Sequence, residues 1–333
     1  MTSNFARRTF LRNTILLAFV TAIGCTLNQN EEPSTEEKGP KVYLDYDQAE
    51  LDAAYNQSPW APNLEHVLAR KNAQNTAATS RIGKPERIAY GPTESEQLDL
   101  YRTEIHNAPI HIYIHGGAWR MGGGTGTTAA IAEMFVKSGA HYLAPDYTLV
   151  QDAEGSLFPM VDQLRRAIVW AYQNASKFSG DRNQIYISGH SAGAHLAAVV
   201  LTTDWLTEFG VPMDIIKGGL CISGMFDLYP VSLSARGEYV AFTDNMVELL
   251  SPIRQLDKLT ARIIVSYGTQ ESPEFQRQSR AFVNELSKAG KDVQLLVGVG
   301  YNHFEINETL ANPHGLLGFT VLKQMGLTNN TQE

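Results

Sequence analysis

The fold of this chain is decided by residues 185–195, which read IYISGHSAGAH. A β-branched run leads into a Gly-x-Ser-x-Gly turn, and a helix of small residues follows at once. The turn is so tight that Gly189 and Gly193 have to be almost free of side chains. It lifts the Ser191 hydroxyl clear of the backbone and directs the N–H of Ala192 at the group that this hydroxyl attacks. The stretch therefore predicts a strand, a sharp turn and a helix, with a nucleophilic serine at the apex.

Strands and helices alternate along the rest of the chain. This alternation predicts βαβ units and an α/β fold with a mostly parallel sheet that helices cover on both faces. We expect one domain over residues 41–333, with an irregular stretch after residue 223, because no repeat or linker divides it. The expected strands are 87–90, 97–101, 109–115, 141–145, 184–188, 218–223, 262–267 and 293–299. The expected helices are 48–55, 64–82, 127–137, 160–175, 192–202, 274–289 and 313–325.

The composition excludes several classes of protein. Of 333 residues, 43% are hydrophobic and 19% are charged, which is enough apolar material for a buried sheet. The net charge is −8, and basic residues cluster only near the N-terminus, so nucleic acid is not an expected partner. The nine histidines and two cysteines show no HExxH or paired CxxC spacing. We therefore expect no metal site and no cofactor.

Residues 1–24 are expected to be an export signal. They contain RRTFLR, which resembles a twin-arginine signal, followed by an uncharged run too short to span a bilayer. The run ends in AIGC, which resembles a lipoprotein cleavage site with Cys25 as the lipidated residue and Ala22 where leucine is usual. Residues 25–40 are polar and acidic, as in a flexible tether.

These features indicate an exported bacterial protein, periplasmic or anchored to the membrane through its lipid alone. A plain secretory signal or an uncleaved anchor are the alternatives. If Cys25 carries lipid, Cys221 is left without a partner. It lies in an apolar strand, so we expect a buried free thiol and no disulfide.

A serine nucleophile needs a base, and three histidines follow Ser191. His195 lies one helical turn beyond the serine and is expected to point into packing. His314 lies at the start of the last expected helix, where it can serve as a polar capping residue. His303 directly follows the strand 293–299, at the edge of the sheet where the catalytic loops gather. We predict His303 as the base.

The base in turn needs a carboxylate that holds its ring. Glu271 lies four residues beyond the strand 262–267 and before the next expected helix, and we predict it as the acid. Glu274 is a rival, although an acid in the first turn of a helix is favourable for the helix dipole alone. Asp227, after the strand 218–223, is a second rival. The predicted triad is thus of the Ser-His-Glu type.

Donors for the oxyanion are expected from residues 115–119, which read HGGAW and follow a predicted strand. Glycines let the backbone turn its N–H groups toward the reacting carbonyl. We expect the N–H groups of Gly117, Ala118 and Ala192 to hold the oxyanion, with Gly116 shaping the loop.

From about residue 50 to residue 325, these motifs resemble the α/β-hydrolase superfamily, and within it the kynurenine formamidase and hormone-sensitive-lipase-like esterase branch. HGGAW at 115–119 looks like the oxyanion motif of the formamidases, and GHSAGAH at 189–195 looks like their nucleophile turn. SGMFDL at 223–228 and ESPEFQRQS at 271–279 resemble two further stretches of the family. The family's acid is usually aspartate at the position of Glu271. The resemblance implies an eight-stranded, mostly parallel sheet.

The substrate pocket is expected to include His190, Phe226, Tyr301 and Trp119. For Trp119 we keep open the alternative that its ring only covers the oxyanion loop from water.

The leading hypothesis is an exported serine hydrolase that cleaves small carboxylic esters, with esters of aromatic alcohols as a candidate class, through an acyl-enzyme. The alternative is an arylformamidase acting on N-formylkynurenine or another anilide. Motif similarity favours the alternative, whereas the export signal opposes it, because tryptophan breakdown is an intracellular pathway. The third hypothesis is a non-catalytic binding lipoprotein on the cell surface, against which the presence of the nucleophile, the base and the oxyanion glycines argues.

Overall fold

The computed structural model describes residues 38–328. The export signal predicted over 1–24, the lipidation predicted at Cys25 and most of the tether predicted over 25–40 lie outside the described residues. Within residues 38–328, no helix combines the length and the apolar character that crossing a membrane requires. The same part of the chain contains no group of three His, Cys, Asp or Glu side chains arranged for a metal ion.

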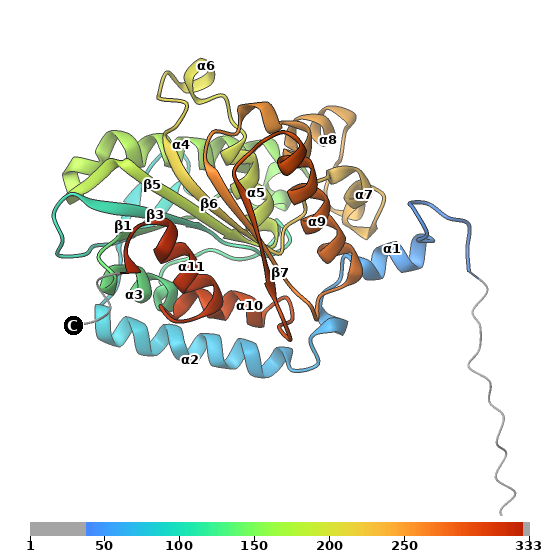
Figure 1. The fold of residues 1–333 in the computed structure, drawn as a ribbon, viewed down its shortest axis with the longest axis horizontal. Helices are drawn as coiled ribbons and strands as arrows, with labels where there is room; N and C mark the ends of the chain where they lie inside the picture. The colour runs from blue at the N-terminus through green and yellow to red at the C-terminus, as the bar shows by residue number, and fades with distance from the viewer. Residues whose placement is uncertain (1–37, 329–333) are drawn as a thin grey trace, which may run out of the picture. The chain divides into compact units, whose positions relative to one another are not determined.

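The centre of the molecule is one eight-stranded sheet with the order β1-β2-β4-β3-β5-β6-β7-β8 (Figure 1). β2 runs antiparallel to both of its neighbours, and every pairing from β4 across to β8 is parallel. The predicted eight-stranded, mostly parallel sheet is thus confirmed. The strands are β1 Glu86–Ala89, β2 Gln97–Tyr101, β3 Ala108–Ile114, β4 His141–Pro145, β5 Gly180–His190, β6 Ile216–Ile222, β7 Arg262–Gly268 and β8 Val293–Gly298.

Helices cover both faces of the sheet because the strand residues alternate between two apolar cores. Ile110 and Ile112 pack in the core that contains α4, α5 and α9, whereas Tyr113 packs in the core of α3 and α11. The alternation is a consequence of the two-residue period of a strand. The helices are α1 Gln48–Ala54, α2 Leu64–Ile82, α3 Ala129–Lys137, α4 Phe158–Asn174, α5 Ala192–Leu201, α6 Trp205–Phe209, α7 Leu228–Ser232, α8 Asp244–Leu250, α9 Pro273–Lys288, α10 Glu305–Glu308 and α11 Leu316–Gln324.

The structure departs from the sequence prediction in several places, among them the unpredicted short helices α6 and α10. β5 begins at Gly180 rather than at residue 184. The stretch after residue 223, expected to be irregular, contains the short helices α7 and α8, which begin after the capping side chains of Asp227 and Thr243. Helices of five and seven residues show too little of the 3.6-residue period to be found by it. Cys221 is a buried free thiol, as predicted.

Helix α2 is the element that most concerns the site. Of its 19 residues, only Val67 and Ala78 are buried. It packs along α3, and the Arg81 guanidinium holds the Glu133 carboxylate of that helix with two hydrogen bonds of 2.6 Å. Figure 1 shows α2 running along the outside of α3 and α10. Several of its residues also line the cavity described below.

Candidate active site

Ser191 occupies the turn between β5 and α5. Its backbone has φ 59° and ψ −123°, a conformation that residues with side chains rarely adopt. A Cβ atom added at Gly189 would lie 2.1 Å from the carbonyl oxygen of Gly193, and one added at Gly193 would lie 2.2 Å from that of Ile114. The Ser191 N–H donates to the carbonyl oxygen of Ile222 at 2.8 Å. The structure thus contains the sharp turn that the glycine spacing predicts.

His303 and Glu271 form a hydrogen-bonded pair. The Nδ1 atom of His303 lies 3.1 Å from Oε2 of Glu271, whose side chain is fully buried. The other carboxylate oxygen accepts hydrogen bonds of 2.6 Å from the Ser223 hydroxyl and from the N–H of Gly268. The His303 ring also packs edge-on against Phe275. A carboxylate held in this way orients the imidazole and stabilises its protonated form.

The two rival carboxylates have other partners. Asp227 caps α7 and forms an ion pair of 3.3 Å with Arg254. Glu274 is buried and binds Arg277 at 2.7 Å. Of the three candidate acids, the structure therefore brings Glu271 to the histidine.

The rival histidines are equally engaged elsewhere. His195 is buried, and its Nε2 donates to the carbonyl oxygen of Leu250 at 2.7 Å while its Nδ1 accepts from Trp119 at 3.2 Å. His314 is exposed and lies just before α11. Of the three candidate bases, His303 lines the same cavity as Ser191, and His195 and His314 do not.

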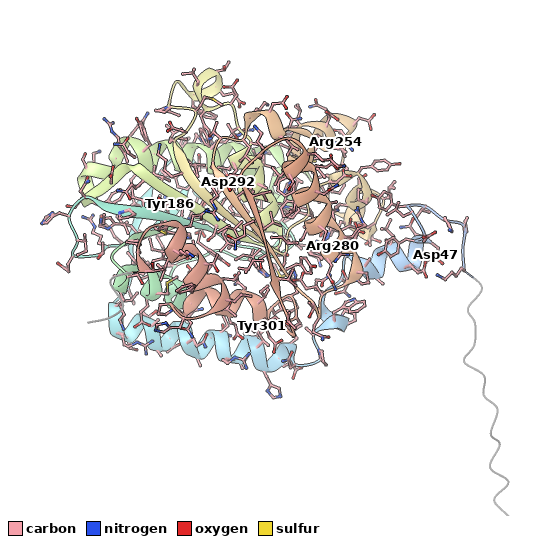
Figure 2. All side chains as sticks on the ribbon, in the orientation of Figure 1. Asp47, Tyr186, Arg254, Arg280, Asp292 and Tyr301 are labelled. Carbon is pink, nitrogen blue, oxygen red and sulfur yellow. The ribbon has the colours of Figure 1, made fainter. Side chains whose placement is uncertain are left out.

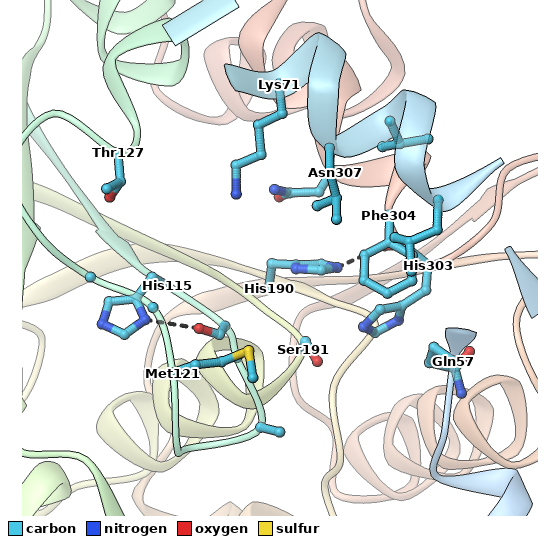
Figure 3. A pocket seen from close by; sticks show the side chains of 18 of the residues that line it. Gln57, Lys71, His115, Met121, Thr127, His190, Ser191, His303, Phe304 and Asn307 are labelled. Atoms are coloured by element: carbon cyan, nitrogen blue, oxygen red, sulfur yellow. Dashed lines mark hydrogen bonds between the residues drawn. The ribbon is translucent and has the colours of Figure 1, made fainter. Parts of the chain in front are cut away.

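The base lies beside the nucleophile, and a second histidine supports it (Figure 3). Within residues 38–328, no hydrogen bond joins the Ser191 hydroxyl to His303. Such bonds are often long in a free enzyme and shorten when substrate binds. The Nε2 atom of His190 donates to the carbonyl oxygen of His303 at 2.8 Å. Burial and the adjacent His303 hold the pKa of His190 well below its ordinary value, so His190 acts as a neutral donor.

The loop 115–119 turns its N–H groups away from the protein's own acceptors. Gly117 has φ 123° and Ala118 has φ 55°. Among the described residues, the N–H groups of Gly117 and Ala118 find no hydrogen-bond acceptor. Ala192 begins α5, so its N–H has no acceptor within the helix. These three donors are therefore available to a developing oxyanion.

Gly116 lets this loop approach the serine turn. A Cβ atom at this position would lie 2.5 Å from the carbonyl oxygen of His190 and 3.1 Å from Cβ of Ser191. We expect Gly116→Ala to lower kcat about 100-fold, because the added methyl group pushes the donors away from the reacting carbonyl. Steady-state kinetics with circular dichroism tests this.

Gly124→Ala is the matched control for that variant. Gly124 has φ 92°, so alanine there is strained, yet its nearest neighbouring atom would lie 3.8 Å away. We expect the control to lose about 1 kcal/mol of stability and to keep its kcat. Equal loss of activity in both variants would show that general destabilisation, and not the position of the donors, accounts for the effect.

Ser191 and His303 line a cavity of about 1090 Å³. This volume is near the upper end of the range typical for small-molecule sites. The walls come from α2, the loops 115–128 and 234–239, and the loop and helix around His303. Figure 3 shows side chains from α2 above the serine and the oxyanion loop below and beside it. A ligand that fills the cavity therefore contacts α2 as well as the reacting groups.

The chain resembles proteins of known activity over this whole region. Residues 98–232 match the family model BD-FAE. Over 291 residues the chain is 33% identical to the kynurenine formamidase of Danio rerio, a match that covers 83% of this chain and 96% of that protein. The chain belongs to the kynurenine formamidase family. It is therefore a hydrolase, as the sequence motifs predict.

More distant relatives of this formamidase-family chain include esterases. The esterase LipC of Mycobacterium tuberculosis is 29% identical over 224 residues, which cover 60% of this chain and 54% of that protein. The crystal structure of the esterase LipW from Mycobacterium marinum superposes with a TM-score of 0.63 at 16% identity, covering 85% of this chain and 95% of that one. The α/β-hydrolase fold is thereby confirmed.

Three of the four residues predicted for the pocket do not line this formamidase-family cavity; His190 does. Trp119 is fully buried beneath the oxyanion loop, where its indole N–H donates to His195. Phe226 is fully buried and stacks on Phe282 at 4.3 Å. Tyr301 follows β8 (Figure 2), and its backbone carbonyl accepts from the N–H of Gln270 at 3.0 Å. The buried ring of Trp119 fits the alternative kept open for it, that it only covers the oxyanion loop. The pocket predictions for Phe226 and Tyr301 were wrong, because position after a strand does not give side-chain direction.

Several residues in and around the site of this family member were not predicted. Ser223 holds the acid, and its φ of 54° aims its hydroxyl from the end of β6. The SGMFDL motif at 223–228, which begins with this serine, was the sequence signal that could have identified Ser223. Lys71 and Asn307 also enter the cavity, and neither lies in a recognisable motif. The presence of Lys71 could be anticipated only from a long helix with few apolar positions placed before the first strand. Asn307 lies on the short helix α10, for which the sequence offered no signal.

Proposed function

We propose that this hydrolase cleaves small carboxylic esters through an acyl-enzyme formed on Ser191. The observation that carries the proposal is the buried Glu271–His303 pair beside the serine turn. His303 and Ser191 line a cavity together with residues of the oxyanion loop. A base oriented by a carboxylate and a set of free N–H donors are the groups that acyl transfer to serine requires.

The steps follow from the positions of these groups. The Ser191 hydroxyl attacks the ester carbonyl while Nε2 of His303 takes its proton, and Glu271 stabilises the resulting imidazolium. The N–H groups of Gly117, Ala118 and Ala192 stabilise the negative oxygen of the tetrahedral intermediate, each by about 3 kcal/mol. The imidazolium then protonates the departing alcohol. Water, deprotonated by His303, releases the acid and restores the serine.

The second candidate is hydrolysis of a formyl anilide. The relative that is 33% identical over 83% of this chain is a kynurenine formamidase, which favours this activity. The same residues can perform it, with the imidazolium protonating an aniline in place of an alcohol. The export signal proposed for residues 1–24 supports the ester, because it would separate the enzyme from intracellular tryptophan breakdown.

The two activities are separated by kcat/KM of the full chain for phenyl acetate and for N-formylkynurenine. We expect the higher value for the ester. A clear preference for the formyl anilide would overturn the first proposal in favour of the second. If neither substrate turns over and a fluorophosphonate does not label Ser191, the chain is a binding protein and both proposals fail.

A further inference from the structure

Lys71 places a positive charge in the active-site cavity. The residue lies on α2 and is exposed as a whole, but its side chain points from the helix into the cavity (Figure 3). Within residues 38–328, its amine makes no hydrogen bond and no ion pair. Figure 3 shows the amine directed toward His190, which adjoins the nucleophile.

The carboxylate of Glu308 favours the charged form of Lys71, but it is shared with an arginine. Glu308 also lines the cavity, but both of its carboxylate oxygens accept hydrogen bonds from Arg70, at 2.9 and 2.6 Å. Burial lowers the pKa of the Lys71 amine, since desolvation penalises its charged form. An anionic ligand would compensate for this penalty.

The other cavity cations differ from Lys71, because they are held by aromatic rings. Arg120 lies over the ring of Tyr239, with 4.7 Å to its centroid. Arg236 lies over the ring of Trp119 and donates to Tyr239 and to a backbone carbonyl. Their charges are already engaged in the protein, whereas that of Lys71 is directed at the empty part of the cavity.

A neutral donor, the side-chain amide of Asn307, lines the same cavity. The Oδ1 atom of Asn307 accepts from the Tyr113 hydroxyl at 3.3 Å, which leaves its NH₂ group for the cavity (Figure 3). An ammonium and an amide NH₂ group can each donate to an oxygen of a carboxylate.

We propose that Lys71 and Asn307 form a subsite for a carboxylate carried by the substrate, so that anionic esters or anilides are preferred over neutral ones. The inference rests on the proposed function and names the substrate class of the same site. A phosphate is the less suitable anion, because the subsite offers one cation and no bidentate guanidinium.

The test uses matched pairs of esters that differ in one charge. In the first pair, 3-acetoxybenzoate and its methyl ester, the charge lies on the leaving group. In the second, phenyl hydrogen adipate and phenyl hexanoate, it lies on the acyl group. We expect the full chain to prefer the anionic member of at least one pair, and Lys71→Met to lower that ratio of kcat/KM values ten- to a hundredfold, mainly through KM.

Two further variants control for this effect. Lys71→Arg keeps the charge and should retain most of the preference. Lys84→Met removes one positive charge just beyond α2, outside the cavity, and should leave the ratio unchanged. A wild-type ratio near one in both pairs, or an equal fall of the ratio in the two methionine variants, would overturn the subsite.

A binding experiment separates failure of the subsite from failure of the proposed function. In the Ser191→Ala background, calorimetry should show tighter binding of 3-acetoxybenzoate or of phenyl hydrogen adipate than of its neutral partner, and Lys71→Met should remove the difference. If the native chain hydrolyses no ester but this difference persists, the esterase proposal fails and the carboxylate subsite stands. If neutral esters turn over and no charge preference is found in binding, the subsite fails alone.

Discussion

Ser191→Ala should lower kcat/KM for any substrate of this enzyme by about 10⁴- to 10⁶-fold, because it removes the atom that forms the acyl-enzyme. The fold should survive. The Ser191 side chain makes no capping hydrogen bond to α5. Alanine at φ 59° carries about the same backbone strain as serine does. We therefore expect a free energy of unfolding within about 1 kcal/mol of the native value.

Steady-state kinetics, thermal unfolding and labelling by a fluorophosphonate together check this prediction. Ser176→Ala, an exposed serine outside the cavity, is the matched control and should keep both its activity and its stability. A folded Ser191→Ala protein that retains more than about one hundredth of the activity would refute acyl transfer to Ser191.

The sheet could be predicted from the sequence because its signal is local and repeated. Continuous apolar runs such as residues 220–222 and 263–265 are fully buried on both faces, as strands in the middle of a parallel sheet have to be. Each of the eight predicted strands overlaps an observed one. The short helices α6, α7 and α8 were missed because their ends are set by capping side chains rather than by an apolar period.

The site residues differ in the same way: those fixed by local backbone structure could be predicted, and those that depend on distant contacts could not. Ser191 and His303 could be proposed because strand ends fix where their backbones lie. Glu271 could only be ranked above its rivals, since the choice depends on whether a partner such as Arg277 already occupies the carboxylate. The pocket was predicted poorly, because it depends on side-chain direction and on α2, whose residues such as Lys71 reach the cavity from far away in the sequence.

Glu271→Gln should lower kcat about 10³- to 10⁴-fold with little change in KM. The Ser223 hydroxyl and the Gly268 N–H both donate to one carboxylate oxygen, so the glutamine oxygen will occupy that position and its NH₂ group will face His303. That NH₂ group donates to Nδ1, which puts the imidazole proton on Nε2. A protonated Nε2 cannot accept the proton of Ser191, and the neutral amide does not stabilise an imidazolium.

Two companion variants separate charge from position and from stability. Glu271→Asp keeps the charge but shortens the side chain, so we expect a smaller loss of kcat, about tenfold, as the carboxylate moves away from His303. Glu274→Gln weakens the buried pair with Arg277, and it should lower thermal stability while keeping kcat. The assignment of the acid is wrong if Glu274→Gln loses kcat as Glu271→Gln is expected to. If both glutamine variants stay active, His303 works without a carboxylate, and the activity depends on the oxyanion donors and the base alone.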